Sequence, residues 1–94
     1  MHRRRVKVAA SSGLHARPAA LLAKAAAAQG IPTTIAKVSD GVPGEPVDTA
    51  SIIGLMTLGA HQGDEVEIAA DEEAAVDALA ELVSRDLDED VVLR

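Results

Sequence analysis

The stretch 12–19, Ser-Gly-Leu-His-Ala-Arg-Pro-Ala, separates a segment of alternating pattern before it from a segment of helical periodicity after it. Gly13 follows two serines and breaks the alternation. Pro18 suits the first turn of a helix over residues 19–29, where no amide hydrogen is needed. A strand-to-helix transition is therefore predicted here, and the remaining elements are placed around it.

The residues at this transition also predict an anion site. Backbone amides in the first turn of a helix lack an intrahelical partner, and the helix dipole favours negative charge there. Arg17 adds a permanent cation whose planar donors match phosphate oxygens. We therefore expect His15 to carry a phosphoryl group, held by the amides of Ala16 and Arg17 and by the Arg17 guanidinium.

Outward from this stretch, period-two alternation predicts strands and 3.6-residue periodicity predicts helices. The predicted strands cover 3–10, 31–38, a short segment near Val47, and 65–70. The predicted helices cover 19–29, 51–59 and a segment that begins after Asp71 as its N-cap, and 39–46 is a loop or long hairpin connection. The order β-α-β-β-α-β-α predicts an α+β fold, a two-layer open-faced sandwich of one sheet and its helices.

The helical faces predict what is buried. On 19–29 the buried stripe is Ala19, Leu22, Ala23 and Ala26, and a neighbouring stripe runs through positions 17, 20, 24 and 27. The last helix buries Ala75, Val76, Leu79, Leu82 and Val83. The segment 51–59, with Ser51 as N-cap and Gly59 as stop, is too apolar for a free surface helix. It is either buried or offers an apolar patch to a partner.

Composition excludes several classes of protein. Ninety-four residues allow one small domain, 1–94, in which 87–94 is expected to fray. Without cysteine there is no disulfide or thiolate metal site, which fits the cytoplasm. No segment has the length and apolarity of a membrane span. The three histidines share no helix face or short spacing, so no metal is expected, and His2 and His61 are assigned no role.

Charge is distributed unevenly along the chain. Residues 1–63 hold seven Lys/Arg against three acidic residues, whereas 64–94 hold twelve acidic residues against two arginines. His15 thus lies in the basic part, which suits a phosphate or an acidic partner surface. The net charge of −6 and the absence of aromatic residues argue against nucleic-acid binding.

The stretch 13–19, Gly-Leu-His-Ala-Arg-Pro-Ala, resembles the active-site signature of the HPr family, the histidine-containing phosphocarriers of the phosphoenolpyruvate:sugar phosphotransferase system. The segments 51–56, Ser-Ile-Ile-Gly-Leu-Met, and 58–59, Leu-Gly, resemble the second motif of that family. The resemblance extends over about residues 5–86. It implies a four-stranded antiparallel sheet of strand order 1-4-2-3, with the helices on one face.

The resemblance also implies a function. The protein would be a phosphoryl carrier rather than an enzyme, without a cofactor, and a monomer. Enzyme I would phosphorylate His15 at Nδ1, giving a pros-phosphohistidine that is passed to IIA domains in sugar transport, while Arg17 steadies the group. By position, the partner-docking residues would be Arg17, Ala20, Lys24, Ala27, Ile52, Ile53 and Met56. Met56 suits the core equally well.

Two features depart from the family pattern. The loop 38–46 is longer than is common, and Ala50 stands before Ser51 where many relatives carry Lys or Arg. In some branches a serine kinase phosphorylates the residue at Ser51, but with Asp48 nearby and no cation the N-cap role is favoured. Two alternatives stay open: a regulatory module of the same fold that docks without transferring phosphate, and a carrier of a dihydroxyacetone or nitrogen-regulatory branch.

Overall fold

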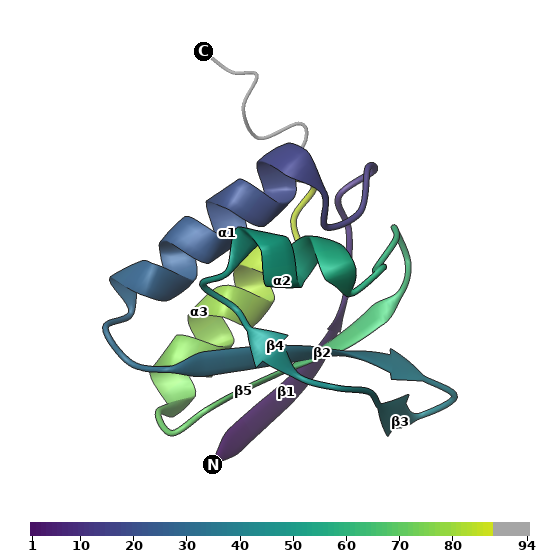
Figure 1. Ribbon diagram of the computed structural model, residues 1–94. Helices are drawn as coiled ribbons and strands as arrows, with labels where there is room; N and C mark the ends of the chain where they lie inside the picture. The colour runs from purple at the N-terminus through teal and green to yellow at the C-terminus, as the bar shows by residue number, and fades with distance from the viewer. Residues whose placement is uncertain (88–94) are drawn as a thin grey trace.

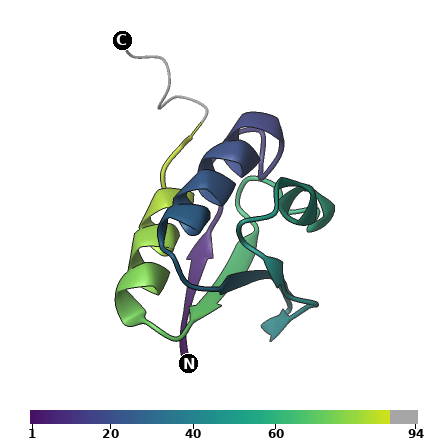
Figure 2. The same cartoon turned by 60° about the vertical axis from the view of Figure 1, so that its left-hand side comes forward.

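One antiparallel sheet and three helices form two layers, with the helices on one face of the sheet (Figures 1 and 2). The computed structural model describes residues 1–87. Its elements are β1 His2–Lys7, α1 Ala16–Ala28, β2 Thr33–Ser39, β3 Val42–Pro43, β4 Val47–Asp48, α2 Ile52–Thr57, β5 Glu65–Ala70 and α3 Glu73–Val83. The predicted α+β open-faced sandwich is confirmed. None of the helices within 1–87 is long and apolar enough to cross a membrane.

The sheet has the order β1-β5-β2-β3, and β4 pairs with β2 as well. Every pairing is antiparallel, with Arg5 of β1 opposite Glu67 of β5, and Ile35 of β2 opposite Ile68 of β5. The four predicted strands correspond to β1, β2, β4 and β5, so their order of 1-4-2-3 is confirmed. A loop over residues 8–15 joins the edge strand β1 to α1, and the helix begins at one end of the sheet (Figure 1).

The strand β3 is an addition to the prediction, which left 39–46 as a loop or hairpin connection. Ser39 pairs with Val42, so only Asp40 and Gly41 form the turn. Both have positive φ, 52° and 78°, as two-residue hairpin turns require, and Asp-Gly is a pair that favours this geometry. Because of Asp40 and Gly41, part of the segment 39–46 forms a short hairpin between β2 and β3 rather than an irregular loop.

Several predicted boundaries were wrong. The first strand ends at Lys7 rather than at residue 10. The reason is that the Val8 amide donates to the carbonyl of Asp64 in a loop, and the Ala9 amide donates to the carbonyl of Val83 at the end of α3, so neither amide pairs with a strand. The first helix begins at Ala16 rather than residue 19. The N-cap of α3 is Glu72 rather than Asp71, and its side chain makes no capping hydrogen bond.

The core lies between the sheet and the helices. The stripe on α1 is confirmed, since Ala19, Leu22, Ala23 and Ala26 are all buried. In α3 the buried set contains Ala80, whereas Leu82 is only half-buried. The predicted frayed tail began at residue 87, but Leu87 is only 1% exposed and packs in the core. Residues 88–94, the rest of that tail, lie outside the described residues.

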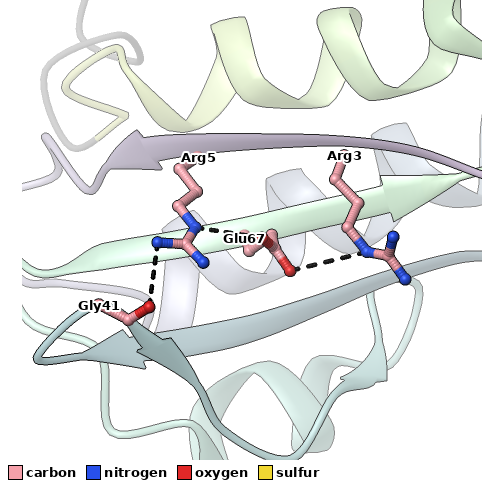
Figure 3. A network of polar contacts seen from close by, with 4 residues as sticks. All are labelled: Arg3, Arg5, Gly41 and Glu67. Carbon is pink, nitrogen blue, oxygen red and sulfur yellow. Dashed lines mark hydrogen bonds and ion pairs between the residues drawn. The ribbon is translucent and has the colours of Figure 1, made fainter.

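The uncovered face of the sheet carries charged side chains (Figure 3). Glu67 accepts from Arg5 Nε at 3.1 Å and pairs with Arg3 Nε at 3.9 Å. Arg5 also donates to the Gly41 carbonyl at 3.2 Å, which ties the β3 hairpin to β1 (Figure 3). Exposed pairs of this kind contribute about 0–1 kcal/mol each, so they keep this face solvated more than they stabilise it.

The loop before α1 is fixed against the loop before β5. Leu14 donates its backbone amide to the Ala60 carbonyl at 3.1 Å. Gly13 has φ of +76°, and a Cβ there would lie 2.6 Å from the same carbonyl oxygen and 3.0 Å from His61 Cα. Only glycine allows this approach, because a side chain would force the two loops apart.

Gly13→Ala should therefore lower the free energy of unfolding by roughly 3 kcal/mol, since a steric clash adds to the cost of a left-handed backbone. Gly30 is the matched control: its φ is +74°, but nothing lies within 4 Å of the added Cβ. Gly30→Ala should cost about 1–2 kcal/mol. Urea unfolding of both variants measures the difference, and equal losses would contradict the close packing of the two loops.

Candidate functional site

His15 occupies the N-cap position of α1. Its backbone is extended, with φ of −122° and ψ of 162°, and its side chain makes no capping hydrogen bond. The residue is half-buried. The ring is therefore presented at the helix end, while Leu14 on one side and Pro18 on the other are buried and anchor the backbone.

The first turn of α1 leaves two amides available beside His15. The Ala19 amide bonds to the His15 carbonyl at 3.4 Å, and Pro18 has no amide hydrogen. The amides of Ala16 and Arg17 have no backbone acceptor within residues 1–87, as expected for the start of a helix. Ala16 has φ of +41°, a left-handed value that costs a non-glycine residue roughly 1–2 kcal/mol. The two amides predicted to bind an anion are thus without a backbone partner in the described residues, and their binding of an anion stays a prediction.

Arg17 leaves its charge available at the same end. The residue is exposed, and within 1–87 its guanidinium forms no ion pair or side-chain hydrogen bond. The first turn of α1 contains no acidic residue that would neutralise the helix dipole. Electropositive groups therefore gather around His15 without an internal counter-ion from the described chain.

The predicted docking residues lie on one exposed surface formed by α1 and α2, which sit side by side in both views (Figures 1 and 2). On α1 the stripe of Arg17, Ala20, Lys24 and Ala27 is exposed. On α2, Ile53 is 76% exposed and Ile52 and Met56 are also exposed, while Leu55 is buried beneath them. We call these seven exposed residues the helix face. Met56 thus belongs to the surface more than to the core.

Ser51 is the N-cap of α2, as predicted. Its Oγ accepts the backbone amide of Gly54 at 3.0 Å. A Cβ on Gly54 would lie 3.2 Å from Ser51 Oγ and 3.3 Å from Val47 Cβ. Glycine inside this short helix is therefore explained by the close approach of the cap and of β4.

The structure places His61, to which the sequence assigns no role, close to His15. The ring of His61 lies 6.2 Å from the ring of His15, centroid to centroid, with the planes inclined by 52°. Nothing in the sequence indicated this, because the two histidines are far apart and meet only when the loops around Gly13 and Ala60 pack together. His2 is at the opposite end of the sheet, where it pairs with Ala70 (Figure 1).

Asp64 organises the loop that carries His61. Its Oδ2 accepts the His61 backbone amide at 2.9 Å, and Lys37 Nζ lies 3.5 Å away. The pKa of Asp64 is lowered, chiefly by that backbone hydrogen bond; burial is the next largest effect and opposes it, and Lys37 lowers the pKa further. The carboxylate is therefore ionised at neutral pH. No group of three side chains suited to binding a metal occurs among residues 1–87.

Comparisons with known proteins agree with this arrangement. Residues 2–85 match the family model described as the PTS HPr component phosphorylation site. The chain is 46% identical over 92 residues to the phosphocarrier protein HPr of Streptomyces coelicolor, covering 95% of each chain. It is also similar to the structure of HPr from Bacillus anthracis, with 36% identity, a TM-score of 0.74 and coverage of 87% of this chain and 95% of that one. An HPr structure from Thermoanaerobacter tengcongensis has 34% identity, a TM-score of 0.72 and coverage of 88% and 91%. This chain therefore belongs to the HPr family, the phosphocarriers of the phosphotransferase system.

Proposed function

We propose that this protein accepts a phosphoryl group from enzyme I on Nδ1 of His15 and passes it to IIA domains of sugar permeases. The observation that carries the proposal is the placement of His15 beside two helix amides and Arg17, none of which has a backbone acceptor or ion-pair partner among residues 1–87. Membership of the HPr family supports the same role. The protein is thereby a covalent carrier, and no substrate other than the phosphoryl group is required.

The chemistry needs little from the carrier itself. A neutral imidazole nitrogen has a lone pair and is a competent nucleophile near pH 7. As the bond from phosphorus to the donor breaks, the bond from phosphorus to Nδ1 forms, and the next transfer reverses this at the acceptor. Positioning and charge stabilisation supply most of the catalysis in phosphoryl transfer. His15 is positioned for transfer by its extended backbone at the start of α1. Its ring makes no hydrogen bond that caps the helix, so the ring is available to the phosphoryl group.

The charge on the phosphoryl oxygens is stabilised by the groups at the start of α1. The Ala16 and Arg17 amides are donors that need no reorganisation, and the helix dipole adds to them. The Arg17 guanidinium can donate to the same oxygens and must not bind them too tightly, since the group has to leave. Arg17 is exposed, and solvent weakens its interaction with the phosphoryl oxygens enough for the group to leave.

Partners are proposed to dock on the helix face around His15. Ile52, Ile53 and Met56 are exposed apolar side chains on a short helix, next to the cationic stripe of α1. An apolar centre with a charged rim is the usual composition of a protein interface. The role of Ser51 as a kinase site stays a prediction; its hydroxyl serves as the N-cap of α2. The branch of the phosphotransferase system that the carrier serves also stays open.

Incubation with enzyme I and labelled phosphoenolpyruvate tests the function. The native protein should take up label that is labile to acid and stable to alkali, as phosphohistidine is. His15→Ala should abolish the label, whereas His2→Ala should retain it, because His2 lies at the far end of the sheet. Absence of label on the native protein with a competent enzyme I would contradict carrier function and favour a regulatory docking module.

Docking is tested separately from chemistry by Ile53→Ser. Removing this exposed apolar side chain should weaken binding to enzyme I about tenfold or more, as for a central interface residue, with little change in the free energy of unfolding. Val42→Ser is the matched control, because Val42 is 65% exposed but lies on the β3 hairpin (Figure 1). Calorimetric titration compares the two variants, and an equal loss of affinity in both would argue against the helix face.

A further inference from the structure

His61 lies close enough to His15 to interact with a phosphoryl group there. The ring centroids are 6.2 Å apart, which is less than the screening length of about 8 Å in physiological salt. The backbones that carry the two rings are held together, because Gly13 packs on Ala60 and His61, and Leu14 donates its amide to Ala60. The fold therefore fixes where the two side chains are attached, while the His61 side chain itself is 73% exposed.

The surroundings of His61 leave one ring nitrogen for the site. Nδ1 lies 3.6 Å from Asp64 Oδ2, and Nε2 has no partner among residues 1–87. The negative charge of a carboxylate at this distance orients the ring. With Nδ1 turned to Asp64, Nε2 is the nitrogen able to donate to an oxygen outside the loop.

The charged groups around His61 determine how protonation of its ring changes the net charge next to His15. Among residues 1–87, the charged and titratable groups recorded around the ring are Asp64 in its own loop, Lys37 on β2 beside that carboxylate, and His15 next to the start of α1. Lys37 Nζ lies 3.5 Å from Asp64 Oδ2 and donates to the Gly59 carbonyl at 3.3 Å, so it is fixed beside the carboxylate. Because Lys37 already balances Asp64, protonation of His61 adds one net positive charge next to His15.

We propose that His61 is a further residue of the phosphoryl site, whose protonated ring stabilises the phosphoryl group on His15. The imidazolium form of the ring carries a positive charge and the neutral form does not, so the stabilisation is greater in acid than in alkali. This inference rests on the proposed function. It gives the carrier a higher phosphorylated fraction at acidic pH than a neutral side chain at position 61 would give.

The test measures an equilibrium, which separates this effect from docking. With catalytic amounts of enzyme I and fixed concentrations of phosphoenolpyruvate and excess pyruvate, a difference between variants in the phosphorylated fraction at the end point depends only on the carrier's own free energies. A docking defect slows the approach to that end point and leaves its value unchanged. The end point is measured at pH 6.0 and pH 8.5 by the phosphorus NMR signal of phosphohistidine.

For His61→Gln the equilibrium constant for phosphorylation should fall about two- to fivefold at pH 6.0, the size expected of an exposed charge pair. At pH 8.5 it should match the native protein. His61→Lys should exceed His61→Gln at both pH values, because its cation does not titrate there. His2→Gln, the matched control, should equal the native protein throughout, since His2 lies at the other end of the sheet.

Two results would overturn the inference. One is an unchanged equilibrium constant for His61→Gln at pH 6.0 while the native protein is labelled normally, which leaves the proposed function intact. The other is an equal loss in His61→Gln and His61→Lys, which indicates a structural role for the side chain. Failure of the native protein to take up label would instead contradict the proposed function itself.

Discussion

Leu14 donates its amide to the carbonyl of Ala60, and Gly13 lies so close to that carbonyl that no side chain fits at its position. This backbone contact joins the loop after β1 to the loop before β5. It sets where α1 begins, and so it sets the direction in which His15 is presented. Because it is made by backbone atoms and a glycine, the position of the histidine does not depend on a flexible side chain.

The rest of the fold supplies a surface around that point. The apolar stripe of α1 is buried against the sheet, which leaves the stripe from Arg17 to Ala27 exposed beside α2. Leu55 anchors α2 in the core, and Ile53 remains accessible above it. A histidine, cationic side chains and exposed apolar side chains thereby lie on α1 and α2, while the uncovered side of the sheet carries the Arg3, Arg5 and Glu67 network (Figure 3).

The sequence predicted what depends on local periodicity and local chemistry. The buried stripe of α1 and the Ser51 cap follow from residue spacing and type, and the structure agrees with both. The anion site at the start of α1 follows from the same kind of reasoning and stays a prediction. The sheet order required the family resemblance. The strand β3 forms because of the turn at Asp40 and Gly41, and these two residues were predicted to be part of a longer loop. The position of His61 could not be predicted, because it arises from a long-range contact between two loops.

The proposed function depends on a phosphoryl group on His15 that is held by the start of α1. NMR of the phosphorylated protein labelled with nitrogen-15 observes this directly. We expect phosphorus coupling to Nδ1 of His15, together with the largest amide shifts at Ala16 and Arg17. Coupling to another histidine, or unmoved amides at Ala16 and Arg17, would contradict it.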